Sequence, residues 1–410
     1  MSKPKIRFKG YEEDWEQRKL GDIAEFSKGS GYSKGDLIES GTPIILYGRL
    51  YTKYETSISE VDTYVEAKDG SVYSKGGEVI VPASGETAED IARAATVDKS
   101  GVILGGDLNV VSPNEDINSA FLAISISHGN SQRELAKKAQ GKSIVHIHNE
   151  EIKNLVVPFP TKAEQNKIVE YFSSLDNLIT LHQRKCEETK KLKKYMLQKM
   201  FPQNGKRVPE IRFVGFTEDW EQRKFGNVTE LKSASRVHKE EWTTSGVPFY
   251  RSSDVMAAIN GTENEKAYIS EALYEKLSSI SGKLEAGDVL VTGGGSVGKP
   301  YIVPNNEPLY TKDADLLWIK NQGKFHPYFL YEFFFTPTFR SYLSSISHVG
   351  TIAHYTITQL SETPICLPSV GEQQKIGDYF YNIDHLITLH QRKYEELQKI
   401  KKFMLQNMFI

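Results

Sequence analysis

A glycine-rich run in the second half of the chain is the clearest candidate for enzymatic chemistry. Residues 293–299 have the sequence Gly-Gly-Gly-Ser-Val-Gly-Lys, which matches the G-x-x-x-x-G-K spacing of a phosphate-binding loop. Such a loop next needs Ser or Thr to bind Mg²⁺ and then a helix, but Pro300 follows, and residues 301–306 are typical of strand and turn. The corresponding stretch of the first half, residues 82–86, lacks the spacing. The sequence therefore favours a flexible loop over a nucleotide site.

Other catalytic and metal-binding patterns are missing from the sequence. Amino-methyltransferases carry an N/D-P-P-Y/F run that holds the flipped base, and no Pro-Pro pair occurs here. Residues 26–31 are faintly similar to the cofactor-binding glycines of that class, but their counterparts, 231–235, are not. The ten histidines lack H-E-x-x-H spacing, and Cys186 and Cys366 are too far apart for a CxxC metal site. We expect no catalytic residue, metal site or bound cofactor in this chain, and two reduced thiols of a cytoplasmic protein.

The charge of the chain is unevenly distributed. The net charge of −2 argues against DNA binding by bulk positive charge. Lys and Arg outnumber Asp and Glu by nine to five in residues 161–201 and by six to five in residues 369–410, which leaves −7 for the remainder. DNA binding would therefore require locally basic loops, a basic partner, or both. No apolar run approaches the roughly 18 residues of a membrane span, so no membrane is expected as a partner.

An internal duplication organises the 410 residues. Pro4-Lys5-Ile6-Arg7-Phe8 returns as Pro209-Glu210-Ile211-Arg212-Phe213, and residues 13–19 return unchanged as 218–224. Later, residues 178–185 are repeated identically as 386–393. The ends of the two copies match while their middles diverge, which is the pattern of one scaffold carrying two different recognition modules.

Each copy closes with a long expected helix. Residues 161–164 and 369–372 fit the S/T-x-x-E capping box. Apolar residues then recur at spacings of three and four, the pattern of a coiled-coil seam. The seam residues are Ile168, Phe172, Leu175, Ile179, Leu192, Met196 and Met200, then Ile376, Phe380, Ile383, Ile387, Tyr394, Leu397, Ile400, Met404 and Met408. Each helix needs a partner for this stripe, and its duplicate is the obvious one; ordinary packing in a globular core is the alternative.

Short apolar runs between the helices predict β-rich modules. Strands are expected at 79–81, 102–104, 109–111, 289–291 and 316–319, and short helices around 118–128 and 327–345. The expected fold class is α+β (mixed), with two β-rich domains each followed by a long α-helix, the helices pairing as an antiparallel coiled coil. The expected boundaries are 1–155 for module 1, 156–205 for its helix, 206–364 for module 2 and 365–410 for its helix.

This order and these motifs together resemble the specificity subunits of type I restriction–modification enzymes. Residues 4–21 and 209–226 are similar to the family opening P-x-I-R-F…W-E…L-G, with Phe225 at the Leu position. Residues 158–185 and 364–393 are similar to the family closing P-x-P…E-Q-x-K-I…L-D-x-L-I…H-Q-R-K, although residues 367–369 are Leu-Pro-Ser. The resemblance covers nearly all of the chain, twice.

The resemblance implies a non-catalytic subunit that binds double-stranded DNA. Each module would be a target-recognition domain that reads one half of a split, asymmetric target. The helices would act as a ruler and dock two methyltransferase subunits, through which restriction nuclease–translocase subunits would join. S-adenosylmethionine, ATP and Mg²⁺ would be bound by those partners. The rival is a non-enzymatic coiled-coil scaffold whose modules bind a protein ligand; the acidic total favours it, whereas the divergent polar loops favour DNA.

Polar loop residues are the candidates for DNA contact, because these residue types read base edges and hold phosphates. In module 1 they are Lys28, Ser30, Tyr32, Lys34, Tyr47, Arg49, Tyr51, Ser84, Thr87, Lys142, His146 and His148. In module 2 they are Arg236, His238, Tyr250, Arg251, Ser252, Ser253, Asp254, Thr292, Ser296, Lys299, Thr351, His354 and Tyr355. Aligned from Pro43 and Pro248, residues 47–49 fall opposite 252–254, and two half-site specificities require such differences. Solvated loops without a ligand are the alternative.

The repeated octapeptide supplies the candidates for partner contact. Two copies of one partner need two copies of one surface, and the exposed members expected there are Gln183, Arg184, Lys185, Gln391, Arg392 and Lys393. The alternative is that they form only the solvated side of the coiled coil, worth tenths of a kcal/mol each.

Overall fold

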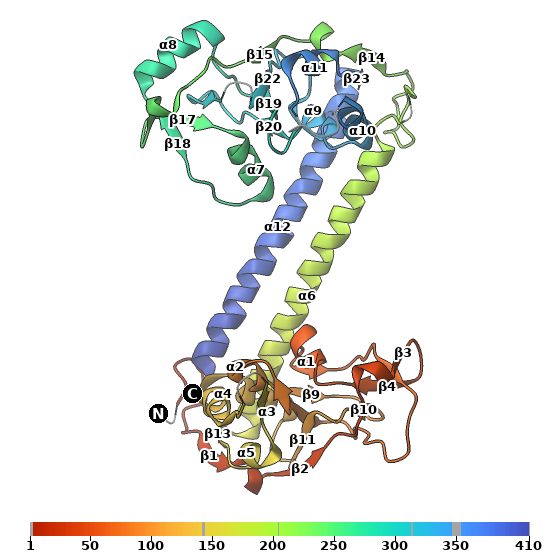
Figure 1. Ribbon diagram of the computed structural model, residues 1–410, viewed down its shortest axis with the longest axis vertical. Helices are drawn as coiled ribbons and strands as arrows, with labels where there is room; N and C mark the ends of the chain where they lie inside the picture. The colour runs from red at the N-terminus through yellow and green to blue at the C-terminus, as the bar shows by residue number, and fades with distance from the viewer. Residues whose placement is uncertain (1–2, 142–143, 204, 313–314, 347–353, 410) are drawn as a thin grey trace. The chain divides into compact units, whose positions relative to one another are not determined.

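The computed structural model consists of two compact units. It describes residues 3–141, 144–203, 205–312, 315–346 and 354–409. Unit 1 contains the chain up to His182 together with the residues from Arg392 onward, and unit 2 runs from Gln183 to Gln391. Each unit therefore holds one module and a part of each long helix (Figure 1).

Two long helices, α6 (Lys162–Lys199) and α12 (Val370–Met408), confirm the expected helices. At each start a hydroxyl accepts a hydrogen bond from the amide three residues later, Thr161 Oγ1 from Glu164 N and Ser369 Oγ from Glu372 N, both at 3.4 Å. Most seam residues are buried or half-buried. Leu192 is an exception: its side chain is 47% exposed, so its assignment to the seam is wrong. Cys186, six residues before Leu192, is buried and is the residue of α6 that lies in the seam there.

The helices pair in antiparallel fashion within unit 2, and they also pair in unit 1. In unit 2, Cys186 Sγ of α6 lies 3.6 Å from Gln391 Oε1 of α12. Seven residues further along α6, Lys193 Nζ contacts both carboxylate oxygens of Asp384 at 2.7 Å, seven residues earlier in α12. In unit 1, Asp176 of α6 forms an ion pair with Lys401 of α12. These contacts agree with the predicted antiparallel coiled coil.

A buried ion pair joins the opening of each copy to its long helix. In unit 1, the Arg7 guanidinium donates to both carboxylate oxygens of Glu164 at 2.6 and 2.7 Å. In unit 2, Arg212 makes the same pair with Glu372 at the same two distances. Both glutamate side chains are fully buried. These glutamates were predicted to cap their own helices; instead the arginine of the repeated opening takes the carboxylate.

Unit 1 is built around two sheets. The larger has the order β2-β11-β7-β9-β5, formed by β2 (Ala24–Lys28), β5 (Ser57–Ile58), β7 (Glu78–Pro82), β9 (Ala95–Val97) and β11 (Leu108–Pro113). The smaller has the order β10-β4-β6-β3, formed by β3 (Leu37–Ile38), β4 (Thr42–Ile45), β6 (Tyr64–Val65) and β10 (Ile103–Leu104). Two further pairs are β1 (Glu16–Lys19) with β13 (Val156–Phe159) and β8 (Ser84–Gly85) with β12 (Val145–His146).

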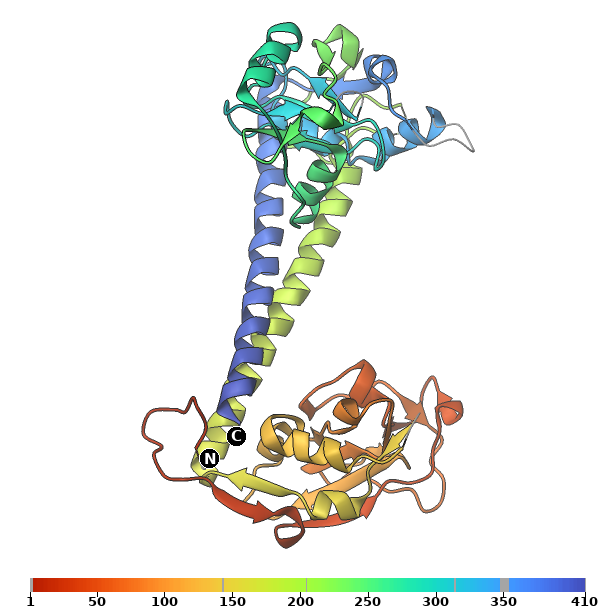
Figure 2. The same cartoon turned by 60° about the vertical axis from the view of Figure 1, so that its left-hand side comes forward.

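The helices of unit 1 are short except for the parts of α6 and α12. They are α1 (Arg49–Thr52), α2 (Ala88–Ile91), α3 (Ser119–Ser127), α4 (Gly129–Lys138) and α5 (Asn149–Lys153). Helix α3 packs on β7 and β9 of the larger sheet (Figure 2). Its Phe121 shares one core with Trp15 and Phe409, so the module, the opening and the end of α12 are held by the same apolar cluster.

Unit 2 repeats this plan with different detail. Both of its sheets have four strands. The counterpart of the larger sheet, β15-β22-β19-β20, contains β15 (Leu231–Ser233), β19 (Val289–Thr292), β20 (Pro300–Ile302) and β22 (Leu316–Ile319). The counterpart of the smaller sheet, β16-β18-β17-β21, contains β16 (Trp242–Thr243), β17 (Val247–Tyr250), β18 (Ala267–Ile269) and β21 (Tyr310–Thr311). Strands β14 (Glu221–Lys224) and β23 (Pro364–Leu367) pair like β1 and β13.

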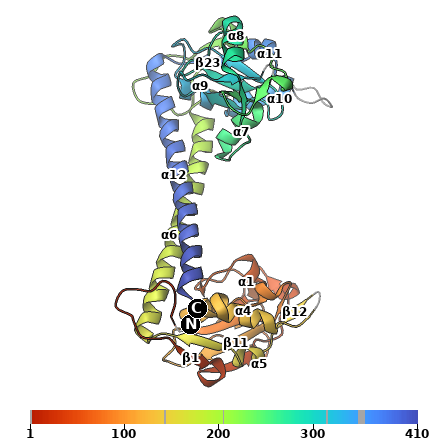
Figure 3. The ribbon, with the colours of Figure 1, turned by 90° about the vertical axis from the view of Figure 1, so that its left-hand side faces the viewer.

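The helices of unit 2 are α7 (Ser252–Asn260), α8 (Glu271–Ser281), α9 (Pro327–Phe333), α10 (Pro337–Ile346) and α11 (Ile357–Glu362). Phe329 of α9 packs in one cluster with Leu197 of α6 and Phe380 of α12. Figure 3 labels the three helices that contribute these residues. The helix predicted around 327–345 is thus two helices, α9 and α10. The cause is local, because Pro337 has no amide hydrogen and favours the start of a new helix, for which Thr336 Oγ1 accepts from Phe339 N at 3.3 Å.

Candidate nucleic-acid interface

The two smaller sheets present loop residues from equivalent places. Pro43 of β4 is paired with Tyr64 of β6, and Pro248 of β17 is paired with Tyr268 of β18. Strands β4 and β17 each also have a parallel neighbour, and each is followed along the chain by a helix, α1 in module 1 and α7 in module 2. The strands therefore support the alignment of Pro43 with Pro248. Helix α1 begins at Arg49, whereas α7 begins at Ser252, the residue aligned with Tyr47, so the alignment of residues 47–49 with 252–254 stays a prediction.

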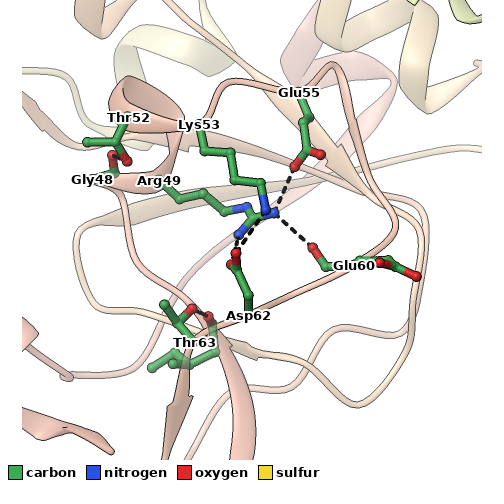
Figure 4. Close-up of polar contacts among 9 residues, drawn as sticks. Gly48, Arg49, Thr52, Lys53, Glu55, Glu60, Asp62 and Thr63 are labelled. Atoms are coloured by element: carbon green, nitrogen blue, oxygen red, sulfur yellow. Dashed lines mark hydrogen bonds and ion pairs between the residues drawn. The ribbon is translucent and has the colours of Figure 1, made fainter. Parts of the chain in front are cut away.

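Arg49 lies inside an acidic pocket of its own loop (Figure 4). Its guanidinium donates to Asp62 Oδ1 at 2.6 Å, to Glu55 Oε2 at 2.7 Å and to the Glu60 carbonyl at 2.8 Å. Lys53 donates to the other Asp62 oxygen at 2.8 Å, and Lys53 and Arg49 together lower the pKa of Asp62 to about 2. The Arg49 side chain is only 8% exposed. In this structure Arg49 fixes the loop, and its own hydrogen-bonding groups are largely used up.

Three candidate residues from separate segments of module 1 meet at one place. Tyr51 OH donates to the Ser84 carbonyl at 2.8 Å, and Ser84 Oγ lies 3.2 Å from His146 Nδ1. The His146 and His148 rings stack at 6.4 Å, and both residues are exposed. Tyr47, also exposed, packs edge-on against Tyr51. The group offers imidazole nitrogens and aromatic faces to solvent, which are suited to base-edge hydrogen bonds and stacking.

The loop after β2 combines exposed lysines with structural hydroxyls. Lys28 and Lys34 are exposed. Ser30 Oγ instead donates to the Leu104 carbonyl at 3.3 Å, and the buried Tyr32 OH accepts from the Lys68 amide at 2.7 Å. Ser30 and Tyr32 therefore position the loop, while Lys28 and Lys34 remain accessible for phosphate contact. Thr87 has a mixed position: it is exposed, and its hydroxyl caps α2 by accepting from Asp90 N at 3.0 Å.

In module 2, the residues after β17 are tied into their own helix start. Arg251 Nε donates to Asp254 Oδ2 at 2.9 Å, and its guanidinium lies over the Trp242 ring. Ser252 Oγ donates to the Asp315 carbonyl at 3.0 Å, whereas Ser253 is exposed. Tyr250 packs against Tyr301 at 5.3 Å between ring centroids. Burial and the Tyr250 hydroxyl raise the pKa of Tyr301, so the Tyr301 hydroxyl is a neutral hydrogen-bonding group.

The glycine-rich run 293–299 is a hairpin loop between antiparallel strands β19 and β20, which agrees with the prediction that it is not a P-loop. Thr292, fully buried, accepts from the Lys299 amide at 2.8 Å and donates to the Ser296 carbonyl at 2.5 Å. The Arg340 guanidinium donates to the carbonyls of Val297 and Gly298 at 3.2 and 2.8 Å. The loop thus offers carbonyls to a cation, whereas a P-loop offers amides to phosphate.

Lys299 and Arg340 form a basic and aromatic group that the sequence did not reveal. Lys299 Nζ lies 5.3 Å and Arg340 Cζ 5.8 Å from the centre of the Phe335 ring. Burial, with a smaller contribution from Arg340, lowers the pKa of Lys299. Two partly desolvated cations beside each other would be stabilised by an anion such as a DNA phosphate. Lys299 was predicted from its loop, but Arg340 lies more than forty residues away, and only the fold brings it close.

The remaining candidates of module 2 divide by exposure. Arg236, His238, Ser296 and His354 are exposed. Tyr355 is buried, donates its amide to the Gly293 carbonyl at 2.8 Å and so supports the glycine-rich loop from beneath. Lys142 and Thr351 lie outside the described residues. Exposed candidates are therefore found in both modules, while Tyr32, Arg49, Thr292 and Tyr355 are framework residues in this structure.

The octapeptide candidates lie on α6 and α12. Gln183, Arg184 and Lys185 are exposed, and Arg184 forms only a loose pair with Glu188 at 3.7 Å. Arg392 and Lys393 are exposed, whereas Gln391 is half-buried beside Cys186. In the part of the chain that the structure describes, no group of three or more His, Cys, Asp or Glu is placed to hold a metal ion. Among the same residues, no helix is both long and apolar enough to cross a membrane.

The chain is similar to proteins of one family along nearly its full length. The family described as "Type I restriction modification DNA specificity domain" matches residues 12–191 and again 217–399. The Type I restriction enzyme MjaVIII specificity subunit of Methanocaldococcus jannaschii is 23% identical over 399 residues, which cover 95% of this chain and 91% of that protein. The putative MjaX specificity subunit of the same organism is 26% identical over 417 residues, with the same coverage. The crystal structure of a type I restriction–modification system S subunit from M. genitalium has the same fold, with a TM-score of 0.61 at 14% identity, covering 100% of this chain and 99% of that one.

Proposed function

Because this chain belongs to the type I restriction–modification DNA specificity family, whose members recognise DNA and are not catalytic, we propose that each of its modules reads one half of a bipartite target. The family assignment from the sequence motifs is thereby confirmed, and the alternative of a scaffold with protein-binding modules is not favoured. The proposal concerns what the individual modules do.

The observation that carries the proposal is the contrast between a constant frame and variable loops. Both units share a buried ion pair, here called the Arg–Glu clamp, which is Arg7 with Glu164 in unit 1 and Arg212 with Glu372 in unit 2. They also share the strand pair at the ends of the module, β1 with β13 and β14 with β23. On this common frame, the exposed loop residues differ: they include Tyr47 and His146 in module 1 and His238 and Ser253 in module 2. Bases are distinguished by donor and acceptor patterns, so equivalent loops with different groups would read different sequences.

The helices are proposed to dock two methyltransferase subunits through apolar residues rather than through the octapeptide charges alone. In unit 1, Leu178 is 42% and Phe403 54% exposed; in unit 2, Leu386 is 45% and Tyr195 50% exposed. Leu178 and Leu386 are equivalent in the duplication, as are Tyr195 and Phe403. Exposed apolar groups at matching places indicate an interaction surface, and one such surface per unit suits two like partners. Restriction subunits, S-adenosylmethionine, ATP and Mg²⁺ are expected to join through those partners.

An exchange of modules tests the assignment of one module to one half-site. Residues 25–155 would be replaced by the corresponding segment of a relative, which retains Arg7, β1, β13 and Glu164. The assembled enzyme would then be expressed, and its methylated sites would be mapped by methylome sequencing. We expect one half of the target to change and the other half to stay. A change in both halves, or in neither, would contradict the proposal.

A further inference from the structure

Unit 1 contains a cleft of about 1650 Å³ beside the end of α12. Its walls include the opening segment, strand β13, the start of α4 and the last turns of α12. Apolar side chains line part of it, among them Val156, Pro158, Leu405 and Phe409. Val156 is 50% exposed although it lies next to the core of the module. The cleft is therefore an open and partly apolar surface of unit 1.

The equivalent place in unit 2 is filled by the chain itself. Phe201, the counterpart of Phe409, is followed there by Pro202, Gly205 and Lys206, which surround a remaining space of only about 70 Å³. Thr338 Oγ1 donates to the Pro202 carbonyl at 2.9 Å. The counterpart of Thr338 in unit 1 is Asn130, which lines the open cleft and has an amide able to donate in the same way. Unit 2 thus shows that this place accommodates a short stretch of polypeptide, which turns where the Lys206 amide donates to the Gln203 carbonyl at 3.1 Å.

The positive charges in the cleft of unit 1 favour an acidic polypeptide. Its walls carry five Lys or Arg side chains against the single carboxylate of Asp176; the cations are Lys3, Lys5, Arg133, Lys401 and Lys402. Asp176 is already paired with Lys401. Opposite charges near these cations would be stabilised in a partly enclosed site.

The start of α4 adds a second preference for negative charge. Its N-cap residue, His128, makes no capping hydrogen bond through its side chain, and burial lowers the pKa of His128 to about 4, so its ring is neutral. In unit 2 the equivalent residue is Thr336, whose hydroxyl caps α10. A helix start without a cap favours a carboxylate, because its first amides lack intrahelical acceptors.

We propose that this cleft binds a short acidic segment of a partner protein, with a carboxylate at the start of α4 and the backbone held by Asn130. Because the equivalent place in unit 2 is occupied, the segment would bind once per chain. It would therefore distinguish unit 1 from unit 2, which two identical docking sites on the helices cannot do. The proposal does not depend on which bases the modules read.

Peptide binding to the full-length protein tests the proposal. The probe is a fluorescein-labelled peptide with the sequence of residues 202–207 in which Lys206 and Arg207 are both changed to Glu; the unchanged peptide is its basic control. We expect fluorescence anisotropy to show binding of the acidic peptide, and binding at least about tenfold weaker, or about 1.4 kcal/mol, for the basic peptide. Arg133→Glu combined with Lys402→Glu should weaken binding of the acidic peptide by a similar factor or more.

A matched control separates the cleft from general charge. Lys194, exposed on α6, is the counterpart of Lys402 in unit 2, so Lys194→Glu should leave peptide binding unchanged. Absence of acidic-peptide binding, or equal binding after charge reversal in the cleft, would overturn the proposal. So would a result in which the reversal weakens only duplex DNA binding, because the cleft would then serve DNA. Absence of peptide binding would not change the result expected from the exchange of residues 25–155.

Discussion

Glu332 is a carboxylate buried where the duplicated unit has an apolar residue. It lies on α9, is fully buried, and its Oε1 is 2.7 Å from Lys193 Nζ of α6. Lys193 also contacts Asp384 of α12. The equivalent residue in unit 1 is Ile124, also buried. Burial raises the pKa of Glu332 to about 8, against the smaller opposing effect of Lys193.

The raised pKa predicts a pH-dependent stability that Glu332→Gln should remove. The pKa in the folded state exceeds the ordinary value, so the contribution of Glu332 to stability is present at low pH and is lost as pH rises through about 8. Between about pH 5 and pH 9, thermal unfolding of the original protein should therefore fall in midpoint relative to Glu332→Gln. Lys193→Met should extend this fall to higher pH, because Lys193 favours the charged form and its removal raises the pKa of Glu332 further. A constant difference between the two proteins across this range would contradict the assignment.

Which candidate residues are exposed could be predicted from the sequence only in part. Loop position and residue type were enough to select Lys28, Tyr47 and His146, which the structure leaves exposed. The same criteria selected Arg49, because they do not show that the chain folds Glu55 and Asp62 back onto it. The acidic residues Glu55 and Asp62, six and thirteen positions after Arg49, were a visible signal. The burial of Thr292 and Tyr355 depends on packing from distant segments, and no local pattern reports it.

At the scale of elements, periodicity identified the long helices and the core strands, because the spacing of apolar residues records which face is buried. The two-residue strands of the smaller sheets, such as β6, are too short to show a period. The exposed Leu192 fits the spacing of the seam but not its geometry. Antiparallel pairing places Cys186 and Lys193 against α12 instead, and this register depends on the partner helix.

In each unit the Arg–Glu clamp joins the opening segment to the start of a long helix, so the two segments depend on each other and are duplicated together. Arg7→Ala should destabilise unit 1 by about 3 kcal/mol, because it leaves the buried Glu164 carboxylate without its partner. Arg212→Ala should do the same to unit 2 through Glu372. Hydrogen–deuterium exchange should localise each effect to the opening and first helical turns of the affected unit, with the other unit unchanged.

An exposed pair provides the control for the clamps. Arg18 contacts Glu16 at 2.9 Å with side chains 37% and 64% exposed, so Arg18→Ala should cost at most about 1 kcal/mol. Equal losses for Arg7→Ala and Arg18→Ala would show that the buried pairs do not hold the openings in place.

At the scale of the whole molecule, the duplication produces two units that are alike in frame and different in surface. The interhelical ion pairs are equivalent, Asp176 with Lys401 in unit 1 and Asp384 with Lys193 in unit 2. With Phe172 and Phe380 at heptad position a, Leu178 and Leu386 fall at g, and Tyr195 and Phe403 at c. Positions g and c adjoin on one flank of a helix. Each unit therefore carries an exposed leucine and an exposed aromatic ring at matching places on this flank, and unit 2 carries Leu192 at g and Leu389 at c in addition.

Removal of these apolar residues should remove methyltransferase subunits one at a time. Leu178→Glu with Phe403→Glu alters unit 1, and Leu386→Glu with Tyr195→Glu alters unit 2. Each pair of substitutions should weaken one docking site by about 2 kcal/mol or more, because it places charge at a contact that excludes water. Native mass spectrometry should show one methyltransferase subunit per chain for either double variant and none for the fourfold variant, with circular dichroism confirming that the helices persist. Arg184→Glu with Lys185→Glu is the comparison, since these exposed side chains have only a loose ion pair and should cost tenths of a kcal/mol. A fourfold variant that still carries two subunits would place the docking surface elsewhere on the chain. Loss of a subunit from the comparison variant alone would assign docking to the charged residues of the repeated octapeptide rather than to its leucine.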